Sequence, residues 1–570
     1  MVTRSKNGIS KPKAFTAIHA FTAKIDYSKL EPPSFKVVVQ YPQWCKAMDE
    51  EFEALQRQDT WILVPSHPSQ NVVGCKWVYK LKRNSDGSIS RYKARLVAKG
   101  FHQQFGVDFD ETFSPVIKPP TVRIILSLAV QFNWPLKQLD VRNAFLRGHL
   151  KETVHMVQPF GYVDPRFPNY VCKLQKSLYG LKQAPRAWFE RFSTHLLHMG
   201  FASSQADSSL FILRYNGVLV YLLVYVDDII LTGNSPVFIQ SLIAQLSQTF
   251  ELKDLGDLHY FLGLHIHRSP QGLFINQAKY ITNLLTKHNM LNSKPAKTLC
   301  VPNVRLVPDD GSTLLDPHVY RSLVGSLHYL TFTRPDLSFA VHQVCQFMSF
   351  TTDVHLVVAK RILRYLVGTQ HFGALLKPGP LSLSAFSDSD WAGDPYDQRS
   401  TIGFIVFLGS NPITWSAKKQ LTVSRSSTEF EYRALASTAA ELCWIRQVLR
   451  DLGIFLALPP KIWCDNVSAL AIASNPVFHA RTKHIEVDYH FVRERVLRKD
   501  LQIKYISTYD QLADIFTKSL PTHHFQILYS KILFTVVPKV LRGDEDRIKE
   551  VPNASVSNII SFLIKEMVSV

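Results

Sequence analysis

Two adjacent carboxylates interrupt one of the most apolar stretches of the chain. Asp227 and Asp228 lie within residues 218–231, whose other side chains are all Val, Leu, Ile or Tyr. Flanks of this composition predict two buried strands, with the acid pair at the tight turn between them. Two unpaired charges at such a turn are costly unless cations neutralise them, and hard divalent metals prefer carboxylate oxygens. On this segment alone, a metal-dependent phosphoryl-transfer site and a solvated turn are both open.

A third acid could complete such a site. Asp140 ends a short strand predicted over residues 136–141. Phosphoryl transfer by two metals requires several carboxylates that converge on a metal pair about 4 Å apart. One acid at a strand end, beside a hairpin that bears two more, would meet this requirement. We therefore expect Asp140, Asp227 and Asp228 to share one centre.

Four further acids occupy comparable positions in the last third of the chain. Asp388 and Asp465 end predicted strands, Glu431 lies in the first turns of a predicted helix, and Asp514 lies on a late helix. This arrangement suits a two-metal site that activates water against a phosphodiester. Each acid alone also has an ordinary local explanation, because acids are common at strand ends and helix N-termini.

The elements that must position these acids alternate between helix and strand, which predicts mixed α/β structure throughout. Helices are expected at 42–55, 121–132, 183–199, 236–250, 277–291, 319–332, 353–367, 427–450 and 485–497. Strands are expected at 71–82, 88–100, 136–141, 383–388, 402–408, 412–416 and 461–465. Residues 377–380, Lys-Pro-Gly-Pro, are the clearest interior linker.

The strand predicted at 88–100 carries a row of basic residues. Arg91, Lys93, Arg95 and Lys99 fall on one face at a period of two. Such a ribbon can bind phosphates, and it can equally be an edge strand whose charges resist aggregation.

Charge and cysteine usage narrow the functional class. The 570 residues carry a formal net charge of +19, which favours a nucleic-acid partner over simple solubility. None of the seven cysteines lies in a Cys-x-x-Cys pair or has zinc-site spacing, so buried thiols in a reducing compartment fit best. The start resembles no signal peptide, and no apolar run is long enough to span a membrane.

Longer motifs carry a family resemblance. They are residues 74–80, 91–100, 111–116, 136–145, 177–188 and 225–228. This text resembles the reverse transcriptase of copia-type retrotransposons, in order and over most of the chain. The resemblance implies a right-hand polymerase with fingers, palm and thumb. Asp140, Asp227 and Asp228 match its catalytic, metal-binding acids, and the adjacent Val141 is included in the metal site.

The same resemblance implies a nucleotide pocket. Phe145 matches the aromatic residue that stacks under the sugar and excludes a 2′-hydroxyl, with a core aromatic as the alternative. Tyr179, Gly180 and Gln183 match the segment that lines the pocket, and packing explains them equally well. Lys93 and Arg95 fit the strand that contacts the triphosphate.

A second resemblance covers residues 381–520. Residues 385–393, 399–403, 415–420, 427–435, 461–466, 482–486 and 511–515 resemble the ribonuclease H domain fused to these polymerases. It implies a mixed five-stranded sheet and assigns catalysis and metal binding to Asp388, Glu431, Asp465 and Asp514. Asp390 could replace Asp388, and Glu429 could replace Glu431.

These expectations give a domain scheme. Residues 1–35 would form a basic arm or linker, 36–266 the fingers and palm, 267–380 the thumb and connection, 381–520 the nuclease and 521–570 a divergent tail. The expected enzyme is an RNA- and DNA-templated DNA polymerase with fused ribonuclease H. A non-catalytic nucleic-acid-binding relic or domesticated protein is the alternative.

The expected cofactor is Mg²⁺, two ions per active site, with Mn²⁺ as a substitute. Expected partners are an RNA template, a DNA primer, RNA–DNA hybrid and dNTPs, without a membrane. A homodimer or association with other retroelement proteins would fit. The expected location is a retroelement particle in the cytoplasm, the nucleus or both, and the protein is not expected to be secreted.

Overall fold

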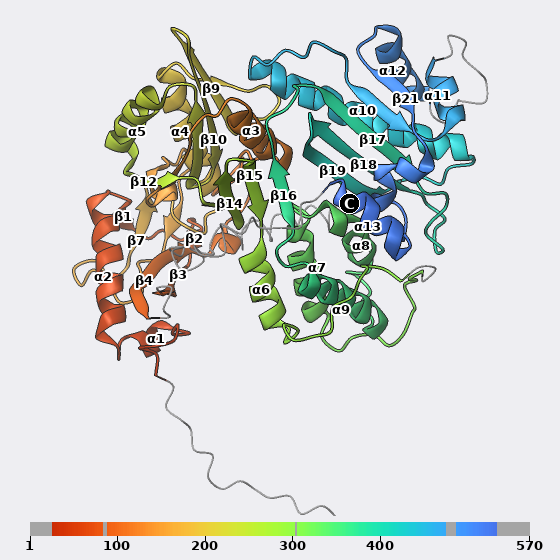
Figure 1. Ribbon diagram of the computed structural model, residues 1–570. Coiled ribbons are helices and arrows are strands. Elements are labelled where there is room, and N and C mark those ends of the chain that lie inside the picture. The colour runs from red at the N-terminus through yellow and green to blue at the C-terminus, as the bar shows by residue number, and fades with distance from the viewer. Residues whose placement is uncertain (1–25, 84–87, 302–304, 475–485, 533–570) are drawn as a thin grey trace, which may run out of the picture.

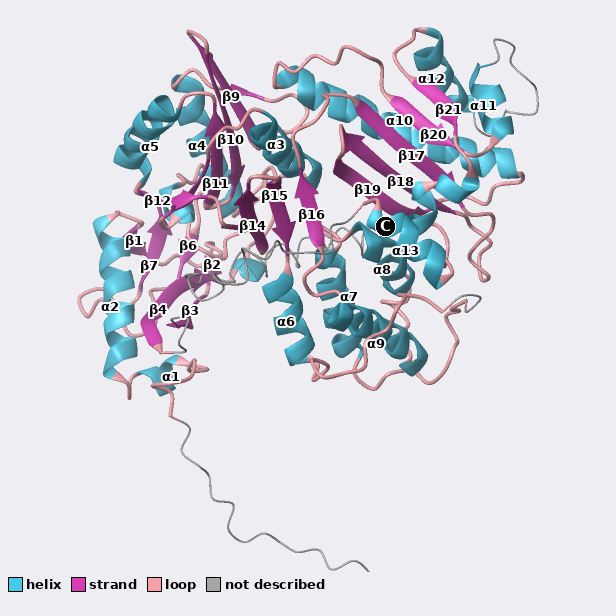
Figure 2. Ribbon diagram, viewed as in Figure 1, coloured by secondary structure: helices cyan, strands magenta, loops and turns pink. Residues whose placement is uncertain are grey.

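The computed structural model describes residues 26–83, 88–301, 305–474 and 486–532. Within these residues, helices and strands alternate in a mixed α/β chain whose strands form five sheets (Figures 1 and 2). Residues 1–25 of the predicted arm and 533–570 of the predicted tail lie outside the described residues, as does the motif at 482–485. No described helix has the length and apolar character needed to cross a membrane.

The first described elements pack around a small core of their own. One sheet has the order β1 (Trp61–Pro65), β7 (Tyr170–Leu174), β6 (His155–Met156) and β2 (Val72–Val73). A separate ribbon pairs β3 (Cys75–Arg83) with β4 (Ile89–Ala98). The short helix α1 (Phe35–Val38) precedes α2 (Pro42–Arg57), and α2 buries Trp44, Met48 and Leu55 with residues of the ribbon.

A six-stranded sheet lies at the centre of the first half of the chain. Its order is β12 (Leu252–Asp257), β5 (Leu136–Val141), β11 (Asp228–Gly233), β10 (Val218–Tyr225), β9 (Leu210–Tyr215) and β8 (Ala202–Ser203). Three helices pack on it, namely α3 (Pro119–Gln131), α4 (Ala184–His198) and α5 (Pro236–Phe250).

Both faces of this sheet are buried, which explains its continuous apolar sequence. Tyr221 and Leu223 join the core that includes α3. Leu222 and Val224, on the alternate positions of β10, join the core that includes α4 and α5. The unbroken run that flanks the acid pair therefore serves two helical layers at once.

A third sheet connects the two halves of the chain. Its order is β13 (Tyr260–Phe261), β14 (Leu264–Ser269), β15 (Gly272–Asn276) and β16 (Gly373–Leu376). Between β15 and β16 the chain forms a helical group of α6 (Ala278–Lys287), α7 (Pro317–Leu330), α8 (Ser338–Cys345) and α9 (Asp353–Gly368). The predicted linker follows β16 directly, and it is short and anchored, because Gly379 N–H donates to Gln131 Oε1 of α3 at 2.7 Å.

The last sheet is mixed and five-stranded. Its order is β19 (Asn411–Lys419), β18 (Thr401–Leu408), β17 (Leu383–Ser389), β20 (Lys461–Cys464) and β21 (Gln502–Tyr505). β17, β18 and β19 are antiparallel neighbours, whereas β20 runs parallel to β17 and β21 parallel to β20. The accompanying helices are α10 (Ser427–Asp451), α11 (Val467–Ser474), α12 (Glu486–Leu497) and α13 (Thr522–Ser530).

The two halves share one hydrophobic core. A single cluster contains Ile124 and Leu128 of α3 together with Ile445 and Leu449 of α10. Polar contacts reinforce this packing: Tyr221 Oη donates to the Leu452 carbonyl at 2.7 Å. The core therefore contains residues from both sides of residue 380, where the sequence predicts a domain boundary. The domain limits themselves stay predictions.

A buried arginine fastens α3 to the last sheet. The Arg123 guanidinium donates to the carbonyls of Ile413, at 2.8 Å, and Phe332, at 2.5 Å. It also lies 3.7 Å from the ring centroid of Trp415, within cation–π distance.

The predicted helices and strands are present, with shifts of a few residues at their ends, apart from two. The strand predicted at 71–82 is divided at Gly74 into β2 and β3, which belong to different sheets. The other exception is the late helix that carries Asp514. Asp514 lies on a short 3₁₀ helix, Leu512–Phe516, instead of an α-helix. Thr517 is the C-cap of this 3₁₀ helix and has a non-helical backbone conformation, so the helix ends there.

Candidate active sites

The first centre forms where three predicted acids meet on neighbouring strands. Asp228 begins β11 and lies directly opposite Asp140 of β5 in the antiparallel register. Asp227 occupies the tight turn between β10 and β11, in which Tyr225 pairs with Asp228. Val141 N–H donates to the Asp227 carbonyl at 2.9 Å, which fixes the turn against β5. The structure thus brings Asp140, Val141, Asp227 and Asp228 together.

The turn itself is held in an uncommon conformation. Val226 has a φ of 53°, in the left-handed region that β-branched residues rarely adopt. A two-residue hairpin requires such a φ, and this residue type costs about 1–3 kcal/mol there. Trp188 of α4 offsets the strain by donating its Nε1–H to the Val226 carbonyl at 2.7 Å. A buried helix therefore supports the position of Asp227.

Burial and mutual repulsion disfavour the charged forms of these acids. Burial, with the charges of Asp227 and Asp140, raises the pKa of Asp228 to about 8. Burial also raises the pKa values of Asp227 and Asp140, whereas Lys93 and Arg95 act in the opposite direction on both. A cluster that resists ionisation is one that a divalent cation would stabilise strongly.

The basic ribbon supplies positive charge beside these acids, as Lys253 and Arg142 also do. Lys93 of β4 is half-buried, and it is close enough to Asp140 for each to shift the other's pKa. The Arg95 guanidinium lies 4.6 Å from the centroid of the Tyr179 ring. Phe145 meets that ring edge to face at 5.1 Å. Four of the predicted nucleotide-pocket residues therefore form one continuous group beside the acids.

The other two predicted pocket residues have clear packing roles. Gly180 has a φ of 91°, and a Cβ there would overlap the carbonyl oxygen of Ala98. Gln183 is fully buried, accepts from Gln103 Nε2 at 2.9 Å and donates to the Asp108 carbonyl at 2.8 Å. Both amide atoms of Gln183 are thus engaged, so its side chain lies behind the pocket rather than on its surface.

The second centre gathers four acids. They come from the ends of two neighbouring strands, β17 and β20, from helix α10, and from the 3₁₀ helix that contains Asp514. Asp388 ends β17, Glu431 lies in the second turn of α10, and Asp465 follows β20. The carboxylates are close to one another: the charges of Asp388, Asp465 and Asp514 all raise the pKa of Glu431. The structure therefore brings the predicted set together.

The alternative acids are engaged elsewhere. Glu429 accepts from Arg433 Nη2 at 2.7 Å and from the Arg425 amide at 2.8 Å, in the first turn of α10. Asp390 accepts from the Thr401 amide across the sheet. These bonds engage both carboxylate oxygens of Glu429, whereas Glu431 keeps a buried carboxylate oxygen, Oε2, without a partner. Asp390 uses one oxygen only and is close enough to Asp388 for that charge to raise its pKa, so it stays the alternative to Asp388.

A lysine that sequence reasoning missed lies among these acids. Lys518 Nζ donates to Asp514 Oδ1 at 2.7 Å and to Asp388 Oδ1 at 3.2 Å. Both carboxylates are almost completely buried, whereas the lysine side chain is 36% exposed. An ammonium group thus compensates two charges that face a prospective metal site. In the sequence, only its position four residues after Asp514 indicates that this lysine could contact that acid.

Ionisation remains unfavourable at this centre despite the lysine. Burial, then the charge of Asp388, raises the pKa of Glu431 to about 9. The same two causes raise the pKa of Asp514 to about 7, with Lys518 opposing them. Asp465 Oδ1 is also buried without a partner. Unpartnered, converging carboxylate oxygens are the donor set that Mg²⁺ prefers, so the residues fit a divalent cation.

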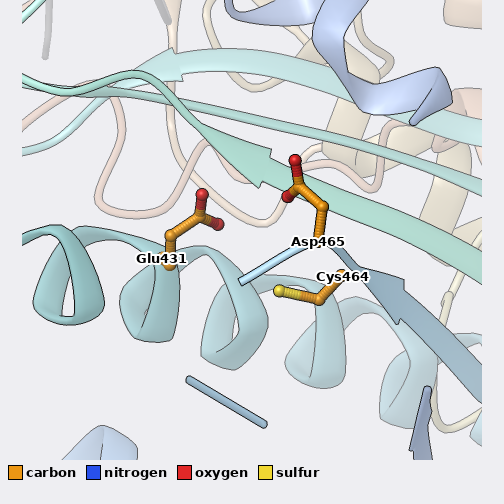
Figure 3. A group of neighbouring side chains, drawn as sticks. All are labelled: Glu431, Cys464 and Asp465. Carbon is orange, nitrogen blue, oxygen red and sulfur yellow. The ribbon is translucent and has the colours of Figure 1, made fainter. Parts of the chain in front are cut away.

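A thiol is the other residue that sequence reasoning missed here. Cys464, the last residue of β20, is fully buried. Ligand atoms of Glu431, Cys464 and Asp465 all lie within 4.8 Å of one another (Figure 3). Figure 3 shows the two carboxylates and the sulfur on adjoining elements, with Glu431 on helix α10 opposite the end of β20.

Comparison with known proteins places both centres in a family context. The family model described as reverse transcriptase (RNA-dependent DNA polymerase) matches residues 58–302. The retrovirus-related Pol polyprotein from transposon RE1 of Arabidopsis thaliana is 51% identical over 540 residues, which cover 94% of this chain and 37% of the relative. The chain thus spans a little over a third of that relative.

A shorter relative is covered completely. The putative transposon Ty5-1 protein of Saccharomyces cerevisiae is 32% identical over 308 residues, which span 53% of this chain and 100% of the relative. Among solved structures, the prototype foamy virus protease–reverse transcriptase aligns at 11% identity, covering 86% of this chain and 77% of that one, with a TM-score of 0.25. The sequence relatives, not this structural likeness, carry the comparison.

Proposed function

Because the chain belongs to the reverse transcriptase family of copia-type retrotransposon Pol polyproteins, we propose that it synthesises DNA on RNA and DNA templates and degrades the RNA of RNA–DNA hybrids. The observation that carries the proposal is the register of β5 and β11, which sets Asp140 opposite Asp228 with Asp227 at the adjoining turn. A solvated turn would not pair its acid with a second acid on a buried strand.

The same proposal assigns parts to the fold. The six-stranded sheet with α3, α4 and α5 would be the palm, and the β3–β4 ribbon with α2 the fingers. The helical group α6 to α9 would be the thumb and connection. The five-stranded sheet with α10 would be the ribonuclease H-like part, in which Asp388, Glu431, Asp465 and Asp514 are the catalytic acids.

Each polymerase residue has a proposed task that follows from its position. Asp140, Asp227, Asp228 and the backbone of Val141 would hold two Mg²⁺ or Mn²⁺ ions, which activate the primer 3′-hydroxyl and neutralise the triphosphate when bound. Lys93 and Arg95 would bind the triphosphate oxygens. Phe145 and Tyr179 would contact the sugar of the bound nucleotide directly. Gly180 would shape the same side of the pocket through its backbone.

The substrates and location follow from the same assignment. They would be an RNA template, a DNA primer, the hybrid they form, and dNTPs, bound by a chain with a net charge of +19. We propose that the protein acts within a retroelement particle in the cytoplasm, in the nucleus, or in both. Self-association or association with other retroelement proteins would be compatible with these roles.

Primer extension tests the polymerase assignment. Purified protein should extend oligo(dT) on poly(rA) with Mg²⁺, and Asp227→Asn should abolish extension while leaving template–primer binding intact. Asp254→Asn on neighbouring β12, where the side chain is exposed, is the matched control and should extend normally. Wild-type protein that binds template–primer and never extends it would favour the non-catalytic binding protein instead.

A hybrid-cleavage assay tests the nuclease assignment separately. Asp465→Asn should stop cleavage of the RNA strand and leave primer extension unchanged, since Asp465 follows β20 of the other sheet. Loss of both activities in Asp465→Asn would contradict two separate centres.

A further inference from the structure

Cys464 stands out because the proposed nuclease reaction does not use it. Hard Mg²⁺ prefers oxygen ligands, and a sulfur atom contributes little to such a site. Yet Cys464 Sγ lies within 4.8 Å of carboxylate oxygens of both Glu431 and Asp465. Among the residues that the structure describes, this is the one group of three such side chains so arranged.

We propose that Glu431, Cys464 and Asp465 form a binding site for a soft divalent cation, Zn²⁺ or Cd²⁺, which excludes Mg²⁺ from the nuclease centre. Zn²⁺ binds Cys sulfur at about 2.3 Å and carboxylate oxygen at about 2.0–2.2 Å. Ligand atoms around one such ion are therefore about 3–4 Å apart, so small side-chain rotations would close the observed group. Water would supply the fourth ligand of a tetrahedral ion.

Two observations beyond the thiol point to a cation here. Glu431 is only 6% exposed, and its Oε2 is buried without a hydrogen-bond partner. Asp465 Oδ1 is likewise buried and unpartnered, while its Oδ2 accepts from Thr508 Oγ1 at 2.8 Å. Two partner-free oxygens beside one sulfur give the mixed donor set that distinguishes Zn²⁺ and Cd²⁺ from Mg²⁺.

Burial and the charges of Glu431 and Asp465 raise the pKa of the Cys464 thiol, so a bound cation would have to displace its proton. The Asn466 amide donates to Cys464 Sγ at 3.4 Å, a bond that the sulfur can keep when it binds a metal. Binding would release the thiol proton to solvent, so one thiolate and two carboxylates would face the ion. The two carboxylates are also proposed Mg²⁺ ligands, and the soft and hard ions therefore exclude each other.

The inhibitory consequence rests on the proposed nuclease function, whereas metal binding does not. Zn²⁺ should therefore inhibit RNA cleavage at concentrations that leave primer extension intact, because no thiol joins Asp140, Asp227 and Asp228 in a comparable group among the described residues.

Cadmium titration of the full-length, metal-free protein tests binding directly. The ultraviolet thiolate-to-Cd²⁺ charge-transfer band should saturate in wild type and lose one Cd²⁺ equivalent in Cys464→Ala and Cys464→Ser. Cys443→Ala is the matched control in the same half of the chain, because Cys443 contacts Arg495 and no carboxylate of this group. It should keep the wild-type band.

Carboxylate variants separate a built site from a lone thiol. In Glu431→Gln, the dissociation constant of the Cys464-dependent Cd²⁺ should rise at least about tenfold, equivalent to about 1.4 kcal/mol. An unchanged band in both Cys464 variants, or unchanged affinity in Glu431→Gln, would overturn the proposal. Circular dichroism of each variant establishes that folding is intact, with Cys464→Ser as the closest replacement in size.

Zinc inhibition gives the functional arm. The Zn²⁺ concentration that halves Mg²⁺-dependent cleavage should be at least about tenfold higher in Cys464→Ser than in wild type, each relative to its own zinc-free rate. Equal sensitivity would overturn the inhibitory role. If wild-type protein cleaves no hybrid, the proposed nuclease function fails, and the cadmium titration still decides whether the site exists.

Discussion

The ammonium group of Lys518 should stabilise the metal-free protein and become dispensable when a divalent cation binds. Lys518→Met keeps the length of the side chain and removes its charge. Two hydrogen bonds are lost, to Asp514 at 2.7 Å and to Asp388 at 3.2 Å. Hydrogen bonds to charged groups contribute about 1.5–3 kcal/mol each.

Partial exposure reduces the expected loss. The Lys518 side chain is 36% exposed, so solvent screens its charge, whereas the two carboxylates are 1% and 3% exposed. We therefore expect Lys518→Met to lower the free energy of unfolding by about 2–4 kcal/mol in EDTA. In Mg²⁺ or Mn²⁺ the ion would compensate the same carboxylates and should bind the variant more tightly than wild type. The difference in stability then shrinks by about 1.4 kcal/mol for each tenfold by which the variant's dissociation constant is the lower.

Urea denaturation in EDTA and in Mn²⁺ measures both effects. Lys531→Met is the matched control, because Lys531 forms a 3.1 Å ion pair with Asp510 in which both side chains are well exposed. Its cost should stay below about 1 kcal/mol and should not depend on metal. Equal stability of Lys518→Met and wild type in EDTA, or a loss that Mn²⁺ fails to reduce, would refute the reasoning.

Three further outcomes are expected. In the metal-free protein the Asp228 carboxyl keeps its proton up to about pH 8, against 3.8 ordinarily, so the free energy of unfolding should fall as pH rises between these values. Asp228→Asn should flatten that fall in urea titrations in EDTA, and an unchanged profile would contradict it. Arg123→Met should cost about 3 kcal/mol, since two buried carbonyls lose a charged donor, and a loss below about 1 kcal/mol would show that the arginine does not fasten the two halves. Gly180→Ala should cost about 3 kcal/mol or more because its Cβ meets a backbone oxygen, whereas Gly217→Ala, with a similar φ and open space, should cost about 1 kcal/mol; equal thermal shifts would refute the clash.

Local pattern predicts much of this fold. The helix expected at 236–250 is α5, with the same bounds, because apolar residues at helical spacing define it and Ser235 caps it. The meeting of Asp140 with Asp228 was also predictable, since both lie at the ends of strands with buried flanks. The pairing follows once those strands are neighbours in one sheet.

The residues that sequence reasoning missed share a physical cause. Neighbours on a strand point to opposite faces, which argues against a joint role for Cys464 and Asp465. Asp465, however, lies just beyond the end of β20, where the pleat no longer applies. Arg123 meets Ile413 across 290 residues of sequence, and no local signal reports such a contact. Lys518 likewise approaches Asp388 across 130 residues of sequence.

The core shared by α3 and α10 has a consequence for how such a chain accumulates inactivating mutations. The apolar side chains of α3 in this core are covered by α10, so loss of the half that contains α10 would expose them to water. Substitution of one proposed nuclease acid leaves this shared core in place, whereas deletion or unfolding of α10 would also damage the half that is proposed to synthesise DNA. Selection for DNA synthesis would therefore preserve the nuclease scaffold even in a lineage that no longer cuts RNA.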